Sequence, residues 1–535
     1  MSADELTGAS GSARRAATTD PRPPARLAAL STVLGAVLLV LVGVLLVEVL
    51  FEAWTQHLGG TVNYDADGKK LGITLPEWPK TVKNALYLAV LLLTAAKVAV
   101  DRSWRRFTTK ADLALVVLGV LMVVAGLLGG SDARLIGEAL FVYFRGVIVF
   151  YAWRAVRPSW GGIYPLLVVL GSVLALNAVV AVVQMIFGIP IYQRMGWLEL
   201  TWASIFRAHG FLDHPNHLGH VLALGMLGLV AWFVTLKQVP RKWWWLFALF
   251  AVALSATQSR EATLGFLAGS VLIGLLRRGG WRRVTAAALA VLLLATAQLA
   301  LRPENRKELQ RRLAGVFSAL ALPSGEEGDD FCVEGTSADT EDCTNRIPQR
   351  EIRLLYAQQG LRILAGSPLL GYGVGQFGGI VAEKDDPNWN LDPRFGQGGF
   401  NMHGSPQKQV DSFWLHLVVE VGVLGLFAYL LWLFFLVWPV LRARPGPLWR
   451  FRASADPPGY QRHLLLYWAP AAVLFLVLVA FLSPAPEDPL FPPLLFSVLG
   501  MAWSLLSRGE LVTRVRDGDD AREPLVMVGE PERAE

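Results

Sequence analysis

Long, unbroken runs of apolar residues recur along the chain and are separated by shorter polar segments. Each run approaches the roughly 20 residues that a helix needs to cross the hydrocarbon core of a bilayer. The runs are continuous rather than alternating, so they predict helices and not the strands of a membrane barrel. We therefore expect an all-α polytopic membrane protein with about twelve transmembrane helices, near residues 27–50, 82–100, 113–128, 136–153, 163–187, 217–236, 243–258, 261–276, 284–301, 413–440, 464–482 and 494–506.

The composition supports this class. Of the 535 residues, 53% are hydrophobic and 17% are charged, and the mean hydropathy is +0.43. Soluble domains carry about 25% charged residues. The formal charge is +6, but the basic residues lie in short loops, as at 101–110, 277–283 and 442–462. This is the distribution of the positive-inside rule, and it argues against nucleic acid as a partner.

With these loops on the cytoplasmic side, the chain divides into five parts. Residues 1–26 and 507–535 are expected to be disordered cytoplasmic ends. Residues 27–301 hold the first nine transmembrane helices, and residues 411–506 hold the last three. Between them, residues 302–410 form a large extracytoplasmic loop.

That loop is expected to be partly helical, because residues 304–322 and 350–364 show helical periodicity. The first of these segments has one basic and one apolar face, which suits a helix lying on the membrane surface. Cys332 and Cys343 flank an acidic stretch of ten residues between the two segments. In an oxidising compartment we expect them to form a disulfide.

Two arginines beside apolar runs are the first candidates for a ligand site. Arg207 lies in FRAHGFLDHPNHL, and Arg260 lies in QSREATLG between the seventh and eighth runs. An arginine at the edge of a bilayer is unfavourable unless an anion meets it, and a guanidinium offers paired donors for phosphate oxygens. Both arginines fall on the same predicted face, so together they predict a diphosphate site. The alternative is that each reaches toward lipid headgroups.

The stretch around Arg207 also contains four histidines, His209, His214, His217 and His220. His217 and His220 can share a helix face, but no carboxylate or cysteine cluster completes a set of metal ligands. We therefore expect neither a metal nor another cofactor. Asp213 or Asn216 is expected to cap the following helix.

The segment before the tenth run, LLGYGVGQF, is rich in glycine. Gly371 and Gly373 begin like a dinucleotide-binding motif, but Gln376 stands where the third glycine would be, and no strand precedes it. These glycines are instead expected to form a tight loop close to the membrane. Asp411 opens the tenth run, and Glu420 lies about two and a half turns further in. Asp411 is either a helix cap or a site residue; Glu420 is either a structural carboxylate or a functional one.

The order of four segments resembles a known family. RAHGFLDHPNHLG, QSREATLG, RILAGSPLLGYGVGQF and DSFWLHLVVEVGVLGL, around a large outer loop, are similar to the O-antigen ligase and polymerase superfamily over roughly residues 110–440. The resemblance implies a membrane glycosyltransferase that takes a glycan from a polyprenyl diphosphate carrier without a metal or a nucleotide sugar. The two characteristic arginines of the family would be Arg207 and Arg260.

Two positions depart from that family. Glu261 stands where a small residue usually follows the second arginine, and Asp411-Ser412 stand where ligases typically carry His-Asn. The sequence therefore leaves open whether the chain is a ligase or a polymerase.

The resemblance implies glycan transfer, with inversion, at the extracytoplasmic face of a bacterial plasma membrane. The donor would be a lipid-linked glycan, the acceptor a glycan or a lipid, and membrane lipids would surround the helices. Asp411 and His403 are the candidates for the base: by position Asp411 is expected to orient the acceptor, and by the pKa of imidazole His403 is the better proton acceptor. His214, Asn216, Glu261 and Glu420 are supporting candidates. The alternative function is a transporter or a flippase, which would need ionisable residues along a path; Glu420 is the clearest of these.

Overall fold

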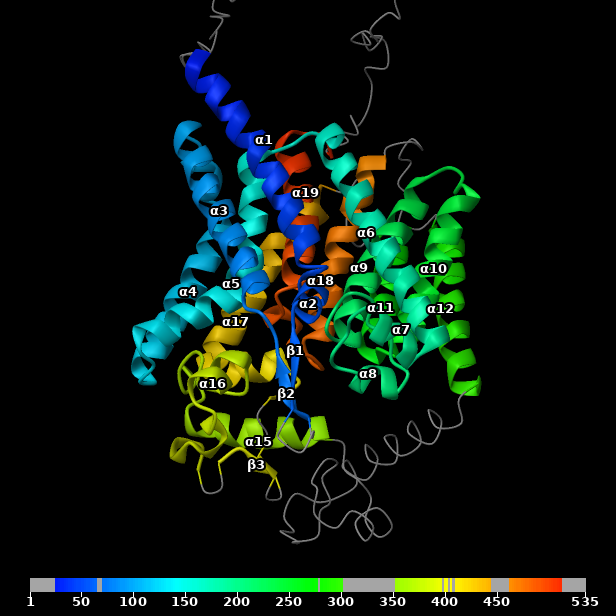
Figure 1. The fold of residues 1–535 in the computed structure, drawn as a ribbon. Coiled ribbons are helices and arrows are strands. Elements are labelled where there is room, and N and C mark those ends of the chain that lie inside the picture. Colours follow the sequence, from blue (N-terminus) through cyan, green and yellow to red (C-terminus); the bar gives the residue numbers. More distant parts are fainter. Residues whose placement is uncertain are drawn as a thin grey trace, which may run out of the picture.

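The computed structural model describes residues 25–64, 70–277, 280–301, 352–396, 399–402, 405–406, 409–443 and 461–511. They form a bundle of helices that run roughly along one axis (Figure 1). Cys332, Cys343 and His403, and the expected helix at 304–322, lie outside the described residues. The prediction of an all-α polytopic protein is confirmed, since seven helices are long and apolar enough to cross a membrane.

Each of the twelve predicted runs coincides with a helix: α1 (Ala25–Glu48), α3 (Trp78–Val100), α4 (Lys110–Leu128), α5 (Ala133–Val156), α6 (Trp160–Phe187), α9 (Pro215–Thr235), α10 (Arg241–Thr257), α11 (Arg260–Leu276), α12 (Trp281–Leu301), α17 (Phe413–Arg442), α18 (Leu464–Val479) and α19 (Phe491–Ser507). The seven long apolar helices are α1, α3, α4, α5, α6, α9 and α17. Four others, α10, α11, α18 and α19, have only 16 or 17 residues. At 1.5 Å per residue such helices are about 25 Å long, so the count of twelve spans stays a prediction.

α9 is the central helix of the bundle. Nearly all of its side chains are buried, and it packs against α10, α11 and α18. Small residues allow these close contacts: a Cβ on Gly219 would meet Ser259 at the start of α11, and one on Gly228 would meet the ring of Trp468 on α18. On the other side of the bundle α5 packs against α19, and α17 against α4.

The two ends of the bundle differ in character. At one end, called the basic end, the arginine-rich loops meet: Arg154 donates to the carbonyl of Arg106, and Arg508 donates to that of Arg157. The opposite end, called the site end, carries the longer connections (Figure 1). The loops predicted to be cytoplasmic and those predicted to be extracytoplasmic therefore gather at opposite ends.

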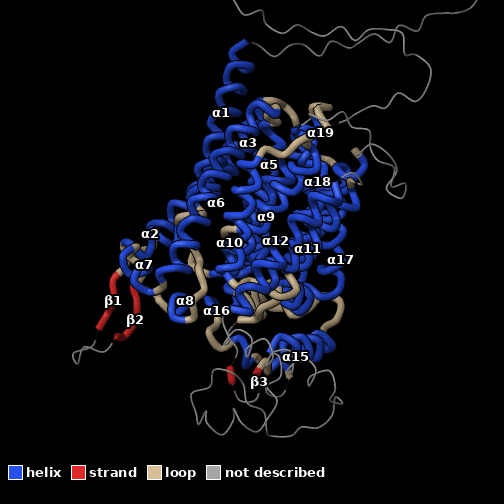
Figure 2. Tube along the Cα trace, turned by 90° about the vertical axis from the view of Figure 1, so that its right-hand side faces the viewer, coloured by secondary structure: helices blue, strands red, loops and turns tan. Residues whose placement is uncertain are grey.

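Several short elements cover the site end: α2 (Glu52–Leu58), α7 (Ile189–Arg194), α8 (Thr201–Ser204), α15 (Ile352–Gly366) and α16 (Ile380–Asp385). α15 corresponds to the helix predicted at 350–364. The strands β1 (Thr61–Tyr64) and β2 (Lys70–Thr74), which the sequence pattern did not predict, form an antiparallel hairpin with Thr61 opposite Thr74. The hairpin projects from the bundle (Figure 2). A second, two-residue pair joins β3 (Asn401–Met402) to β4 (Ser405–Pro406).

α17 is not the continuous helix that the apolar run predicted. Gly422 has φ 69° and ψ −175°, which breaks the helix in its first half. A left-handed φ with this ψ is available only to glycine at low energy. The segment 367–378 enters the break, where Tyr372 N–H donates to the carbonyl of Val419 (2.9 Å) and Val423 N–H donates to that of Pro368 (2.9 Å). The backbone groups that the break would leave without partners are satisfied in this way.

Candidate active site

Arg207 and Arg260 are brought to the same corner of the site end by backbone contacts. Ala208 N–H donates to the carbonyl of Ala256 (3.0 Å), which joins the segment before α9 to the end of α10. The Arg207 Nε–H donates to the carbonyl of Thr257 (3.0 Å), in the turn that leads directly to Arg260. Two arginines that are 53 positions apart in sequence therefore flank one short turn.

The guanidinium of Arg207 is held by a second contact. Its Nη2 donates to Oδ1 of Asn216 (2.6 Å), and the group lies over the ring of Trp202, 5.3 Å from the ring centroid. The Asn216 N–H donates to Nδ1 of His214 (3.0 Å), so His214 caps α9, where Asp213 or Asn216 was expected to do so. Burial lowers the pKa of His214 to about 3, and the positive charges of His217 and Arg207 act in the same direction. His214 is thus a neutral acceptor.

Arg260 begins α11, and the residue after it points into the protein. The hydroxyl of Ser259 caps the helix by accepting from Ala262 N–H, while Arg260 is exposed. Glu261 is buried, and its Oε1 lies 3.1 Å from Nε2 of His220, a fully buried residue of α9. The carboxylate at this unusual position therefore has a partner inside the bundle.

His217 lies between two carboxylates. Its Nδ1 is 2.6 Å from Oδ1 of Asp213, and its Nε2 is 3.2 Å from Oδ2 of Asp488. Asp213 is exposed, whereas Asp488 is buried in the turn between α18 and α19. The contact with Asp213 is a hydrogen bond, and the contact with Asp488 is at ion-pair distance.

The same turn holds a second buried acidic residue. Oε1 of Glu487 lies 2.6 Å from Nδ1 of His416 on α17, and both side chains are almost fully buried. Arg145 of α5, also buried, donates to the backbone carbonyl of Glu487. The turn therefore does not lie on the surface but enters the bundle between α5, α9 and α17.

Asp411 lies at the mouth of the site end, directly before α17. Ser412 caps that helix by accepting from Leu415 N–H, and Asp411 faces Arg353 of α15, with Oδ2 3.5 Å from Nη2. Partial burial raises the pKa of Asp411; the charge of Glu261 also raises it, while Arg353 acts in the opposite direction. The carboxylates of Glu261, on α11, and Asp411, before α17, therefore interact electrostatically.

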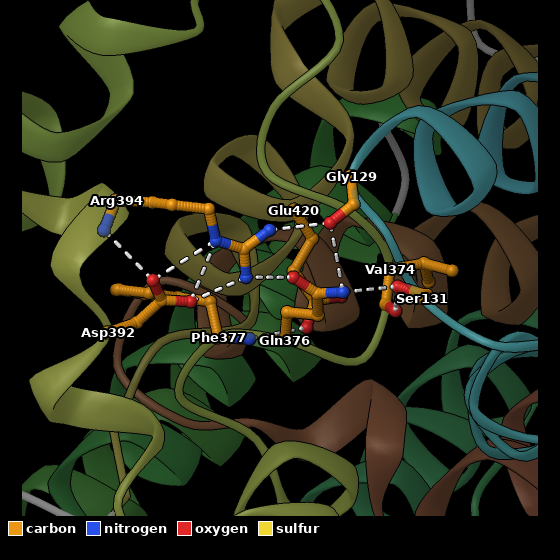
Figure 3. Close-up of polar contacts among 8 residues, drawn as sticks. All are labelled: Gly129, Ser131, Val374, Gln376, Phe377, Asp392, Arg394 and Glu420. Atoms are coloured by element: carbon orange, nitrogen blue, oxygen red, sulfur yellow. Dashed lines mark hydrogen bonds and ion pairs between the residues drawn. The ribbon is translucent and has the colours of Figure 1, made fainter.

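Glu420 lies deeper in α17, beside the break. Its carboxylate accepts from the hydroxyl of Tyr143 on α5 (2.6 Å) and from the N–H of Phe377 in the inserted segment (3.1 Å). Figure 3 shows how the inserted segment is fixed: Gln376 donates to Oγ of Ser131 (2.7 Å) and accepts from Arg394. Glu420 therefore joins α5, α17 and the glycine-rich loop.

A family model described as O-antigen ligase matches residues 245–430, which run from α10 to the first half of α17. This part of the chain matches the O-antigen ligase family. The resemblance recognised in the sequence is confirmed here, and the matched part includes Arg260, Glu261, Asp411 and Glu420. A comparison with curated proteins found no match.

Some residues of the candidate site lie outside the part that matches the O-antigen ligase family. Arg207, His217, Glu487 and Asp488 are among them; folding brings Arg207 to the turn before Arg260 and joins His217 to Asp488. Among the residues that the structure describes, no group of three or more His, Cys, Asp or Glu side chains is placed to hold a metal ion.

An apolar cavity of about 270 Å³ lies within the bundle and is lined by parts of α6, α9, α10, α18 and α19. Its walls run from Val221 and Leu494, in the halves of α9 and α19 nearer the site end, to Tyr164, Trp243 and Leu464 near the basic end. At Gly171 on α6 nothing lies within 4 Å of where a Cβ would be, whereas Gly225 on α9 allows the side chain of Leu174 to approach closely. The cavity thus combines apolar walls with a position between helices that contribute to the site.

Proposed function

We propose that this chain is a membrane glycosyltransferase that transfers a glycan from a polyprenyl diphosphate carrier to a glycan or lipid acceptor. The observation that carries the proposal is the meeting of Arg207 with the turn before Arg260, inside a fold whose central part matches the O-antigen ligase family. Two guanidinium groups at one corner are suited to the four or more oxygens of a diphosphate.

The donor site is proposed to have a polar and an apolar part. Arg207 and Arg260 bind the diphosphate, and Asn216 holds Arg207 in place. The isoprenoid chain occupies the apolar cavity between α6 and α9. Charge develops on the diphosphate as it leaves, and preorganised arginines stabilise that charge more strongly in a site with little water.

In the proposed reaction, a hydroxyl oxygen of the acceptor attacks the anomeric carbon of the glycan. The new carbon–oxygen bond forms as the bond to the diphosphate breaks, so the configuration is inverted, and the hydroxyl proton passes to a base. Asp411 and His403 are the candidates. A raised pKa improves the carboxylate of Asp411 as a proton acceptor, since proton abstraction is favoured by a pKa nearer the operating pH. No metal or organic cofactor is assigned a role in this scheme.

The site end is proposed to face the extracytoplasmic side of a bacterial plasma membrane, because the opposite end gathers the basic loops. Reporter fusions after Lys242 and within the 302–410 loop, at Gly335, test this arrangement. They are expected to give opposite signals for the two sides of the membrane. Equal signals at the two positions would contradict the topology and the location of the site.

The enzymatic activity is tested with purified protein in detergent and a polyprenyl diphosphate-linked glycan. Wild-type protein is expected to release free polyprenyl diphosphate only when an acceptor glycan or lipid is present. Product length separates the two forms of the reaction: a growing series of glycan lengths indicates polymerisation, and a single transfer to a lipid indicates ligation. Absence of transfer with every acceptor class would contradict the proposal.

A specific observation keeps a transporter or flippase as the second candidate. The sequence pattern offered Glu420 as the main ionisable residue within a span, but the structure buries others as well. Arg145 lies within α5, His416 lies within α17, and Lys83 of α3 forms a buried ion pair with Glu52 (2.8 Å). The detergent assay discriminates, because glycan transfer without a membrane or a gradient cannot arise from transport alone.

A further inference from the structure

The turn between α18 and α19 presents two adjacent carboxylates to two different helices. Glu487 faces His416 of α17 at 2.6 Å, and Asp488 faces His217 of α9 at 3.2 Å. The exposed fractions of Glu487 and Asp488 are only 2% and 5%. Buried acidic groups are unfavourable unless they are paired, so each contact matters for the position of the histidine it holds.

The contact between Asp488 and His217 affects the donor half of the proposed site, which comprises Arg207, Arg260 and the start of α9. His217 is in the first turn of α9 and follows Asn216 directly. Asn216 accepts the hydrogen bond from Arg207 at 2.6 Å. A carboxylate that fixes His217 therefore also fixes the helix end that orients the guanidinium of Arg207.

The contact between Glu487 and His416 affects the acceptor half of the proposed site, which comprises Asp411 and the start of α17. His416 lies in the first turn of α17, which Ser412 caps and which Asp411 directly precedes. The same helix end is joined to the end of α18, because Phe413 N–H donates to the carbonyl of Ser483 (3.3 Å). Loss of the Glu487–His416 contact would thus loosen the end that carries Asp411, with no direct effect on α9.

The turn itself is suited to hold two groups at a fixed spacing. Pro484, Pro486 and Pro489 restrict its backbone, and Arg145 donates to the carbonyl of Glu487. Adjacent residues in such a turn cannot move independently by more than a small distance. The separation between the two helix ends is therefore set by one rigid segment.

We infer that Glu487 and Asp488 are positioning residues with separate targets: Asp488, through His217, fixes the donor-binding half, and Glu487, through His416, fixes the acceptor half. The inference rests on the proposed function for the meaning of the two halves. The structural statement, that Asp488 holds the start of α9 and Glu487 holds the start of α17, does not depend on the proposed function.

Hydrogen–deuterium exchange of the full-length protein in detergent tests the structural part. Glu487→Gln and Asp488→Asn keep size and remove charge. Glu52→Gln is the matched control, since Glu52 is also a buried carboxylate in a 2.8 Å ion pair at the site end. Asp488→Asn is expected to speed exchange at 214–220 and not at 412–418, Glu487→Gln is expected to do the reverse, and Glu52→Gln should change neither region.

Steady-state kinetics with a polyprenyl diphosphate-linked glycan tests the consequence. Asp488→Asn is expected to raise the donor KM about tenfold, the scale on which outer partners of a binding group act, with the acceptor KM unchanged. Glu487→Gln is expected to raise the acceptor KM, with the donor KM unchanged. A general loss of folded protein would lower the apparent kcat and leave both KM values unchanged.

The outcomes separate the two ideas. Equal exchange effects of both variants in both regions, or no effect in either, overturn the inference whatever the activity. Selective exchange with unchanged kinetics overturns the link to the reaction and leaves the proposed function standing. If the wild-type protein transfers no glycan, the proposed function fails, and the inference about donor and acceptor halves is overturned with it.

Discussion

Gly422 is the residue on which the break in α17 depends, so its substitution tests how the site end is built. A Cβ at this position would lie 2.5 Å from the amide nitrogen of Leu370 and closer still to the carbonyl group of Leu369. Its φ of 69° with ψ −175° is also a conformation that side chains avoid. Gly422→Ala must therefore either displace the inserted segment or straighten the helix.

The expected magnitude follows from what the substitution removes. Backbone strain of this kind costs about 1–3 kcal/mol. Four backbone hydrogen bonds join residues 368–373 to residues 419–424. At a net value of about 0.5–1.5 kcal/mol each, loss of all four removes roughly 2–6 kcal/mol. We expect the free energy of unfolding to fall by at least about 3 kcal/mol, because strain and bond loss act together.

The measurement is the apparent Tm of purified protein in detergent, with limited proteolysis of the 367–378 segment as a local readout. Gly119→Ala on α4 is the matched control, since nothing lies within 4 Å of a Cβ there. That control is expected to be neutral or to stabilise slightly, because alanine favours a helix over glycine by about 1 kcal/mol. If Gly422→Ala has the same apparent Tm and the same resistance to protease as Gly119→Ala, the reasoning about the break is wrong.

Three further predictions concern the site directly. Arg260→Lys is expected to fold normally but to lose most transfer activity in the detergent assay, because lysine keeps the charge without the paired donors; full activity would reduce Arg260 to a lipid contact. Arg353→Gln is expected to shift the acid limb of the pH–rate profile to higher pH, because Arg353 opposes the rise in the pKa of Asp411 and activity is lost as pH falls through that pKa; an unmoved limb would exclude Asp411 as the titrating group. Gly171→Phe, with an open Cβ position on the cavity wall, is expected to raise the donor KM while Gly119→Phe does not; equal KM values would place the isoprenoid chain elsewhere.

The helices could be predicted from the sequence because apolar runs are a local signal. Each of the twelve runs became a helix, with boundaries that differ by a few residues. The break at Gly422 could not be predicted in the same way, because VVEVGVLGL is apolar apart from Glu420 and an isolated glycine is only a weak helix breaker. The break exists because a segment more than forty residues earlier in the chain supplies its hydrogen bonds.

The buried acidic turn was missed for a related reason. Glu487 and Asp488 stand among prolines in a short connection, a pattern that is typical of an exposed turn. The signal that could have located them was length: the last apolar run, 494–506, is shorter than the roughly 20 residues of a typical spanning helix. A short helix that ends inside the bundle carries its connecting turn inside as well. Arg207 and Arg260, in contrast, could be proposed as candidates from the sequence, because an arginine beside an apolar run is unfavourable unless an anion meets it.

The pairing of Glu261 with His220 shows how the departure from the family pattern fits this fold. A carboxylate beside Arg260 would weaken an anion site if it pointed toward the ligand, because it would repel phosphate. In the structure it points inward and meets a fully buried histidine of α9 at 3.1 Å. The pair links the start of α11 to the first turns of α9, next to His217 and Asn216. The start of α11, which carries Arg260, is therefore tied to the start of α9, whose Asn216 holds Arg207, and Arg260 itself stays exposed, as the proposed diphosphate contact requires.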